Sequence, residues 1–439
     1  MSLNLDLSAL TVSFVTMGCA KNEVDTAHMT DRLIDAGYSV IDDPEQAKCV
    51  IVNTCSFIQA ATEESIEAIL EVAGYESVAQ GDAHLIVAGC MPARYGADLE
   101  AELEEAGAFV PCADEDHIVD VVDGLFGVER ADLPSYGYEH LSAHRPAPVS
   151  AYVKISDGCD RFCSYCAIPY IRGRYHSFAY ADIRAEVARL VENGAREIIL
   201  IAQDTGRWGA DFDEPSTLAW LMGALADEFS DTWFRVMYIQ PEGVTDDLIE
   251  AVAAHDNICN YFDLPLQHVN PDVLRRMNRK GSAEDFFGLI KRIRTRIPDA
   301  TLRTTLIAGF PGETDDQFEE VVDFVTESEF DYVGVFAYSR EEGTRAFDLD
   351  DQVDEDTKNE RTQILRDTAD AACMPRIAAR VGSQMDVLIC GYEEDGQLFS
   401  RAMCQAPDVD GVTFVAEGEP GSIVRVTITD TLLYEMEGE

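Results

Sequence analysis

The sequence has little lysine and no long apolar run. Only six of its 33 basic residues are Lys, and no segment approaches the roughly 18 uninterrupted apolar residues that a membrane span needs. The opening residues MSLNLDLSAL carry neither a basic region nor a long apolar stretch, so we expect a cytoplasmic protein without a signal peptide. Twelve cysteines in such a chain favour metal or cluster ligation, because the cytosol keeps thiols reduced and disulfide scaffolds are rare there.

The charge is strongly acidic, with 82 Asp and Glu against 33 Lys and Arg and a net charge of -49. Such a surface repels nucleic-acid phosphate unless a basic cleft compensates, and it attracts basic partners at a distance. The alternative is adaptation of a whole proteome to high internal salt, which the scarcity of Lys suits. Charge alone is therefore weak evidence about a specific partner.

The first segment, residues 5–130, alternates apolar strands with helical patterns in three consecutive units, which predicts an α/β domain with an open parallel sheet. A cysteine lies at the end of each predicted strand or just beyond it: Cys19, Cys55 and Cys90. Open α/β sheets place their ligand sites at the carboxyl ends of the strands, so we expect these thiols at one edge of the sheet.

Residues 131–149 are rich in Pro, Ala and small polar residues and are predicted to form a linker. Six further strand-helix units over 150–350 predict a partial (β/α)6 barrel with its site at the carboxyl ends of the strands. Residues 351–381 are predicted to be a helical connector. Short strand patterns separated by Gly, Asp and Pro turns over 382–439 predict a small all-β barrel.

The strongest chemical motif is Cys-x3-Cys-x2-Cys, formed by Cys159, Cys163 and Cys166. Three thiolates can hold three irons of a 4Fe-4S cluster and leave the fourth iron open. A structural zinc site usually takes four ligands, and the nearest candidate for a fourth is His176. We therefore favour a cluster over zinc or inert thiols.

The segment DGCDRFCSYCAIP resembles the signature of the radical S-adenosylmethionine (SAM) superfamily, in which the residue before the third cysteine is commonly aromatic, as Tyr165 is. The resemblance implies that SAM chelates the open iron and that Tyr165 lies at the cofactor. It further implies cleavage of SAM to methionine and a 5'-deoxyadenosyl radical that abstracts hydrogen from an unactivated C-H bond.

The second set, Cys19, Cys55 and Cys90, is spaced 36 and 35 residues apart. One such cysteine would most often be a buried structural thiol, but three at equivalent positions of consecutive units favour a second cluster. Their contexts MGCAKNEVD, VNTCSF and AGCMP resemble the amino-terminal domain of the methylthiotransferases, a radical SAM family with two 4Fe-4S clusters. The resemblance covers nearly the whole chain and implies a TRAM-like terminal barrel and a second cluster that supplies or carries sulfur. The other cysteines are predicted to be mostly packing residues: Cys49, Cys112, Cys259, Cys373, Cys390 and Cys404.

Four further residues of the barrel are candidate SAM contacts. Gln203 and Asp204 end the second barrel strand, where the superfamily often binds the amino end of SAM, although an ordinary capped turn explains them equally well. Gly309 and Gly312 follow the fifth strand, where glycine allows either close approach to a ligand or a tight turn.

The substrate is predicted from differences within the family, which modifies either adenosine in transfer RNA or an aspartate of the twelfth small-subunit ribosomal protein. Three segments resemble the ribosomal-protein branch: Lys21 in GCAKNEVDT, the run CDRFCSYCAIPYIRGRYHS, and APDVDGV at 406–412. One departure is Gly206, which follows the QDT segment where the family more usually has Ser. Residues 382–439 hold two basic residues against twelve acidic ones, a net of -10 that suits a basic ribosomal protein better than RNA.

We therefore expect a radical SAM methylthiotransferase that converts C-H to C-S-CH3 on the β-carbon of that aspartate. Its carboxylate could pair with Arg279 or Lys280. The expected partners are the basic ribosomal protein, an electron donor such as flavodoxin or ferredoxin, and a sulfur source, with no membrane. Methylthiolation of transfer RNA is the alternative. A non-catalytic iron-sulfur protein is more distant, because it would usually need four cysteines for each cluster.

Overall fold

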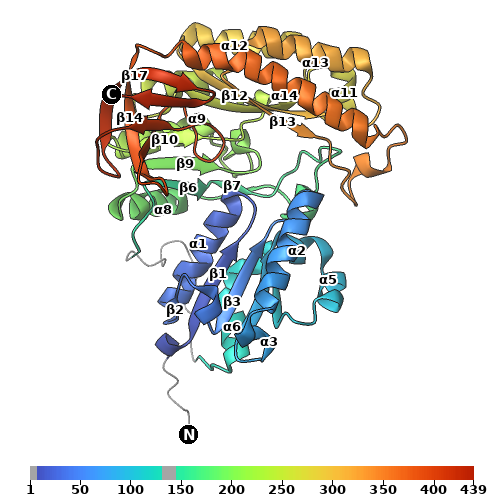
Figure 1. The fold of residues 1–439 in the computed structure, drawn as a ribbon, viewed down its shortest axis with the longest axis vertical. Helices are drawn as coiled ribbons and strands as arrows, with labels where there is room; N and C mark the ends of the chain where they lie inside the picture. Colours follow the sequence, from blue (N-terminus) through green and yellow to red (C-terminus); the bar gives the residue numbers. More distant parts are fainter. Residues whose placement is uncertain (1–6, 131–144) are drawn as a thin grey trace.

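A computed structural model describes residues 7–130 and 145–439, so most of the predicted linker at 131–149 lies outside the described residues. Figure 1 shows the amino-terminal part beneath a larger barrel, with the chain's carboxyl end packed against one side of that barrel. Among the described residues, no helix is long and apolar enough to cross a membrane.

The amino-terminal part contains a parallel sheet with the strand order β2-β1-β3-β4-β5. The central strand β3 is buried along its whole length and rich in β-branched residues, as expected for a parallel sheet covered on both faces. The predicted alternation of strands and helices is confirmed, and two short edge strands extend the sheet. Its strands are β1 Thr11–Thr16, β2 Ser39–Val40, β3 Cys49–Thr54, β4 His84–Gly89 and β5 Ala108–Pro111. Its helices are α1 Ala20–Asp35, α2 Gln59–Ala73, α3 Glu76–Ala79, α4 Cys90–Tyr95, α5 Ala97–Glu102 and α6 Ile118–Phe126.

Six parallel strands follow in two sheets, β10-β9-β6 and β11-β12-β13, which confirms the predicted partial barrel. One bridge between Phe234 and Ile258 lies where the two sheets adjoin. The strands are β6 Ser150–Lys154, β9 Glu197–Ile201, β10 Trp233–Val236, β11 Tyr261–Gln267, β12 Thr301–Ala308 and β13 Tyr332–Ala337, with a small ribbon of β7 Ser156–Asp157 and β8 His176–Ser177. The helices are α7 Ile168–Ile171, α8 Tyr180–Glu192, α9 Leu218–Glu228, α10 Asp246–Ala254, α11 Pro271–Arg276, α12 Ala283–Arg296 and α13 Asp315–Ser328.

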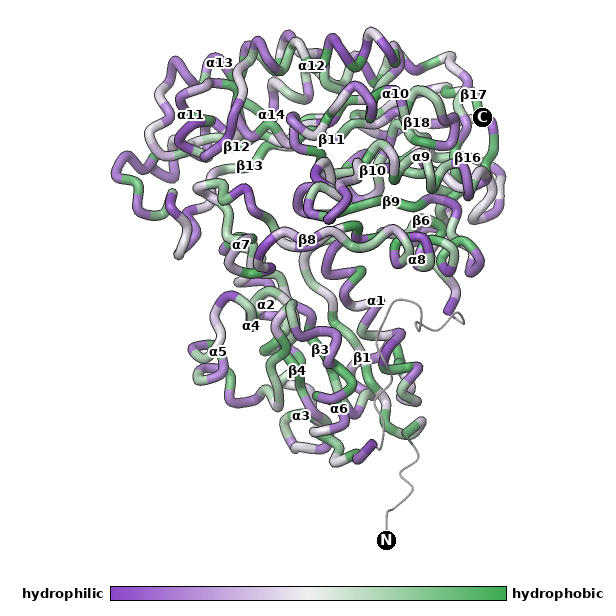
Figure 2. Tube along the Cα trace, turned by 180° about the vertical axis from the view of Figure 1, so that it is seen from behind, coloured by the Kyte–Doolittle hydropathy of each residue, from purple (hydrophilic) through white to green (hydrophobic). Residues whose placement is uncertain are grey.

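Strand β9 divides its side chains between two cores, because successive residues of a strand point to opposite faces. Ile198 and Leu200 pack into the core shared with the barrel helices. Ile199 and Ile201 pack into a second core that also contains residues of α1 and of the terminal barrel. Figure 2 shows these strands as apolar segments in the interior, with polar residues along the outer helices.

The long helix α14 Glu355–Ala378 leads into a closed barrel with the strand order β14-β15-β16-β18-β17. Its strands are β14 Gln384–Tyr392, β15 Leu398–Ala402, β16 Thr413–Val415, β17 Ile423–Leu432 and β18 Glu435–Gly438. The prediction of a small all-β barrel is confirmed, with β18 as an additional strand. It was not predicted because its sequence EMEG lacks an apolar strand pattern.

Buried charges join this terminal barrel to the partial barrel of β6 and β9 to β13. The Glu197 carboxylate on β9 accepts a hydrogen bond of 2.9 Å from Arg235 Nε and one of 2.6 Å from Arg401 Nη2 on β15. Arg235 also donates to the backbone carbonyl of Met403, at 2.9 Å. All three charged side chains are at most 5% exposed, so the terminal barrel is fixed in place by a network without solvent.

Candidate active site

Cys159, Cys163 and Cys166 lie on one loop between β7 and α7, and none forms a disulfide. Gly158 begins the loop with a φ of 71°, and a Cβ there would lie 2.2 Å from the Arg174 carbonyl oxygen, so only glycine fits. The Cys166 amide donates to the Cys163 carbonyl at 3.1 Å, which closes a turn between two of the thiols. Burial, followed by the charge of Cys163, raises the pKa of Cys166, as expected when thiols gather in an apolar place.

Gln203 and Asp204 lie just beyond the carboxyl end of β9 and have buried polar atoms without a partner. Both side-chain atoms of the Gln203 amide and Oδ1 of Asp204 lack a hydrogen bond among the described residues. The other oxygen of Asp204 accepts a 2.6 Å bond from Arg161 Nε, on the cysteine loop. Burial raises the pKa of Asp204 despite that arginine. Unsatisfied buried polar atoms at strand ends fit a polar ligand such as the amino acid part of SAM.

The remaining candidate SAM contacts are Tyr165, Gly309 and Gly312. Burial and the neighbouring Cys163 raise the pKa of Tyr165, which places its ring beside the loop cysteines. Gly309 has a φ of 74°, and a Cβ there would lie 2.3 Å from Lys358 Cγ on α14. Gly312 has a φ of 75° and lies against Arg276. Turn geometry and packing therefore account for both glycines, and their contact with SAM stays a prediction.

The second cysteine set meets at the carboxyl edge of the amino-terminal sheet. Cys19 is the residue before α1, Cys55 follows β3, and Cys90 begins α4. The Sγ atoms of Cys19 and Cys90 lie 3.8 and 4.0 Å from the same atom, Oδ1 of Asn22. Burial raises the pKa of Cys55 to about 11, and Cys90 and Cys19 contribute to the increase, so all three thiols are close enough to interact.

A fourth cysteine lies at this edge, and the sequence analysis assigned it to packing. Cys112 Sγ, at the end of β5, is 3.9 Å from Cys90 Sγ. Its position after a fourth apolar segment, AFVPC, repeats the pattern of Cys19, Cys55 and Cys90. That segment was not recognised as a strand because it is short and contains proline.

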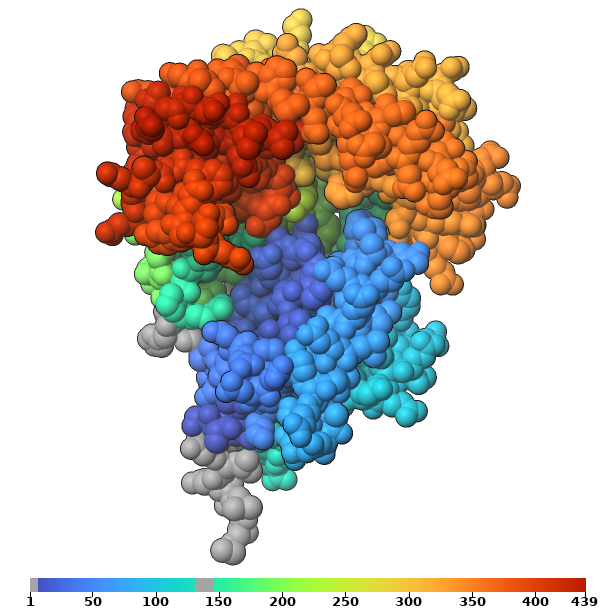
Figure 3. Space-filling model, viewed as in Figure 1, coloured from blue at the N-terminus to red at the C-terminus, as the bar shows by residue number. Residues whose placement is uncertain are grey.

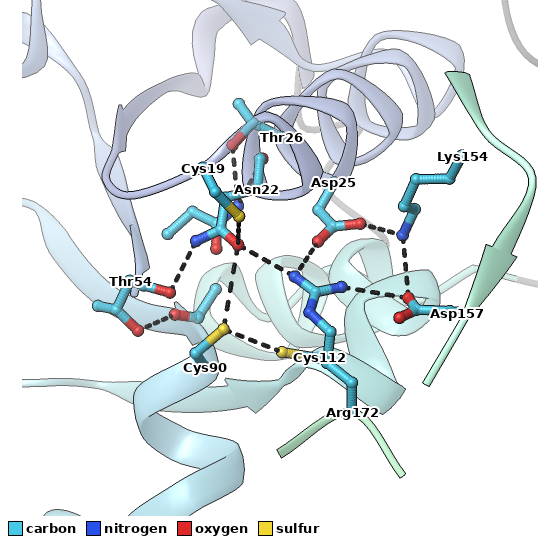
Figure 4. A network of polar contacts seen from close by, with 12 residues as sticks. Cys19, Asn22, Asp25, Thr26, Thr54, Cys90, Cys112, Lys154, Asp157 and Arg172 are labelled. Atoms are coloured by element: carbon cyan, nitrogen blue, oxygen red, sulfur yellow. Dashed lines mark hydrogen bonds and ion pairs between the residues drawn. The ribbon is translucent and has the colours of Figure 1, made fainter. Parts of the chain in front are cut away.

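A buried ionic network connects this edge to the barrel (Figure 4). Arg172, which follows α7, donates to Asp25 at 2.7 Å, to Asp157 at 3.1 Å and to Asn22 Oδ1 at 3.0 Å. Lys154 on β6 pairs with the same two aspartates. Burial disfavours the charge of Arg172, but Asp25 and Asp157 outweigh it and raise the pKa of the guanidinium.

Helix α7 brings the two cysteine sets together. It begins two residues after Cys166, and its residue Ile171 packs with Ala167 and Cys90 in one apolar cluster. One short helix therefore separates the loop of Cys159, Cys163 and Cys166 from the second cysteine set. In Figure 3 the surface is hollowed where the blue amino-terminal part faces the barrel.

The donor sets fit iron-sulfur clusters. Among the described residues, no group of three or more His, Cys, Asp or Glu side chains is arranged to hold one metal ion. Each set offers three thiols without a disulfide, and in a 4Fe-4S cluster each thiolate binds a different iron.

Comparison with known proteins agrees with this architecture. Residues 153–325 match the Radical SAM superfamily, 11–110 match the family described as Uncharacterized protein family UPF0004, and 381–439 match the TRAM domain. The structure is similar to the radical S-adenosylmethionine methyltransferase TsrM from Kitasatospora setae, with a TM-score of 0.55 over 75% of each chain and 16% identity, which shows the shared fold. The domain matches define a radical SAM enzyme, a class that uses SAM and a 4Fe-4S cluster.

Full-length relatives define the family within that class. A relative from Trichlorobacter lovleyi is 41% identical over 99% of both chains, and one from Geobacter sulfurreducens is 39% identical over 98% of both. Each is named ribosomal protein uS12 methylthiotransferase RimO. The chain belongs to this family of radical SAM methylthiotransferases.

Proposed function

We propose that the chain attaches a methylthio group to the β-carbon of an aspartate in ribosomal protein uS12, using two 4Fe-4S clusters. The observation that carries the proposal is the packing of Cys90 against α7, which joins one three-cysteine set to the other. The relatives named for action on uS12 cover the whole chain, including the acidic terminal barrel.

In this proposal Cys159, Cys163 and Cys166 hold the cluster that binds SAM. Gln203 and Asp204 offer unsatisfied atoms to its amino acid part, and Tyr165 lies beside the same loop. When bound there, the reduced cluster and SAM supply a radical able to remove hydrogen from an unactivated C-H bond. Arg161 orients Asp204, because its Nε binds one carboxylate oxygen and leaves the other directed to the ligand.

Cys19, Cys55 and Cys90 hold the second cluster, which is the proposed source or carrier of sulfur. Arg172 holds the Asn22 amide beside these thiols and places a positive charge near an anionic cluster. A buried guanidinium of this kind stabilises negative charge on thiolate and sulfide. Asp25 and Asp157 keep the arginine side chain in place.

The proposed partners follow from the chemistry. A low-potential electron donor such as flavodoxin or ferredoxin reduces the cluster, and a separate compound supplies sulfur. The substrate is a basic protein, which the net charge of -49 attracts at low salt. We propose the cytoplasm as the site of action, where ribosomal proteins are made.

Two triple variants test the assignment of the cysteines. Replacing Cys159, Cys163 and Cys166 with Ala should abolish cleavage of SAM to 5'-deoxyadenosine after anaerobic reconstitution. Replacing Cys19, Cys55 and Cys90 with Ala should keep that cleavage and abolish methylthiolation of uS12, measured by mass spectrometry. Full product formation by the second variant would contradict the proposed sulfur role. If a deletion strain lost the methylthio mass only from transfer RNA, the substrate would be transfer RNA and not uS12.

A further inference from the structure

Lys21 is a cation in a place that does not favour one. It is the second residue of α1, and the first turn of a helix carries the positive end of the helix dipole, which favours anions. Its side chain is half-buried. A cation that opposes both the dipole and burial needs another reason to be there.

Among the described residues, the ammonium group forms no ion pair with a carboxylate. Its described contact is with the face of Tyr238, whose ring centroid lies 3.5 Å from Nζ. Neither Asp263 nor Asp157 is hydrogen-bonded to it. The donors of the ammonium that do not face the Tyr238 ring are therefore available to a ligand.

These aspartates are already occupied by other groups. Asp263 accepts from Arg303 at 3.0 Å through one oxygen and from the Tyr238 amide at 2.9 Å through the other. Asp157 is shared by Lys154 and Arg172. Lys21 is thus a surplus positive charge in a network whose carboxylates already have partners.

The contact with Tyr238 places the Lys21 ammonium group at the carboxyl end of the barrel strands. Tyr238 follows β10 and has a φ of 62°, a conformation that non-glycine residues rarely adopt. Its carbonyl accepts from Thr205 Oγ1 at 3.0 Å, and its amide donates to Asp263, so the unusual backbone is held from both sides. Strain kept in this way is typical of ligand sites.

We propose that the Lys21 ammonium binds the carboxylate of the aspartate that is modified. This inference rests on the proposed function and names the residue that selects its substrate. Lys21 is two residues from Cys19 and touches the strand-end residue Tyr238, so a carboxylate bound there lies between the second cysteine set and the barrel. The adjacent β-carbon is then held where hydrogen removal and sulfur attachment can both reach it.

The two cations predicted from the sequence are placed less suitably. Arg279 already donates to the Pro265 carbonyl at 2.6 Å and lies beside Tyr165 and Cys163, on the loop that would hold the SAM cluster. Lys280 is exposed. Lys21 alone among these three combines partial burial, free donors and proximity to the second cysteine set.

The test compares dissociation constants of fluorescent uS12 peptides carrying either the target Asp or Asn, with reconstituted enzyme. The variants are Lys21→Met, Lys21→Arg as the charge-conserving change, and Lys48→Met as the control at an exposed position. Losing one partner of a desolvated charge pair should weaken binding of the Asp peptide about 30-fold or more. The wild type should bind the Asn peptide as weakly as Lys21→Met does, and the variant should not distinguish the two peptides.

Lys21→Arg should recover part of the preference for Asp, and Lys48→Met should bind as the wild type does. Iron content and SAM cleavage without peptide are measured for each variant, and dissociation constants are compared per cluster-loaded chain, which separates substrate binding from folding. Equal discrimination between the Asp and Asn peptides by wild type and Lys21→Met would overturn the inference while leaving the proposed function intact. Failure of the wild type to modify uS12 at all would overturn both.

Discussion

The buried carboxylate that joins the two barrels gives a quantitative prediction for Glu197→Gln. Burial favours the neutral form of Glu197, but Arg401 and Arg235 outweigh it and lower its pKa from 4.5 to about 2. At about 1.4 kcal/mol for each pH unit, this corresponds to about 3 to 4 kcal/mol of stability at neutral pH. Loss of one partner from a buried ion pair typically costs about 3 to 5 kcal/mol, so the two magnitudes agree.

Thermal denaturation measures the effect. Glu197→Gln should lower the melting temperature by about 5 °C or more at pH 7. The matched control is Asp386→Asn on β14 of the terminal barrel, which removes an exposed pair with Arg425 and should change stability little. High salt should reduce the effect of the control much more than that of Glu197→Gln, because buried pairs are poorly screened.

The pH dependence provides the refutation. The pKa of Glu197 is depressed, so its stabilising contribution is complete above about pH 4.5 and is lost as pH falls toward 2. The difference between wild type and Glu197→Gln should therefore narrow below about pH 4.5. A melting temperature equal to that of the control at pH 7, or a difference that widens on acidification, would refute the reasoning.

Three further predictions concern Asp410, Cys112 and Gly18. Burial raises the pKa of Asp410 to about 6, so the folded state loses stability as pH rises from about 4 to 6; Asp410→Asn should melt above the wild type at pH 8 and no higher near pH 4. In iron-free protein exposed to air, oxygen should oxidise Cys112 and Cys90, whose Sγ atoms are 3.9 Å apart, to a disulfide. Non-reducing peptide mapping would detect this disulfide. Because Cys112→Ala cannot form it, this variant should take up more iron on reconstitution. Gly18→Ala should lower iron bound by the second set without ending SAM cleavage, because its new Cβ would lie 2.4 Å from Cys55 Cβ at a φ of 98°. An unchanged iron content in Gly18→Ala would show that the loop can move aside.

The positions of the six cysteines in the two sets could be predicted because each lies in a short loop or beside a strand with a clear sequence pattern. Cys159, Cys163 and Cys166 need only a short loop, and Cys19 marks the end of a strong apolar strand pattern. The partial barrel was likewise predictable from strands with clear periodicity. Other features depend on tertiary contacts that no local pattern carries.

Cys112 and Lys21 show why those features were missed. Cys112 approaches Cys90 only after β5 joins the edge of the sheet, and β5 is four residues long. The sequence context of Lys21 indicated a branch of the family. That Lys21 pairs with no carboxylate follows only from the tertiary structure, in which Asp263 binds Arg303 and Asp157 binds Arg172. The weak pattern of β18 similarly becomes a strand because β16 and β17 provide partners on both sides.

The position of Arg172 has a consequence for how iron is acquired. The same stretch of chain wraps the first cysteine set and then, through α7, inserts Arg172 beside the second set. Ordering of that stretch at one site therefore preorganises the other, and linkage requires the benefit to be mutual. With both sets holding clusters as proposed, iron loading should be cooperative, so that a wild-type population with limited iron would contain mainly full and empty chains.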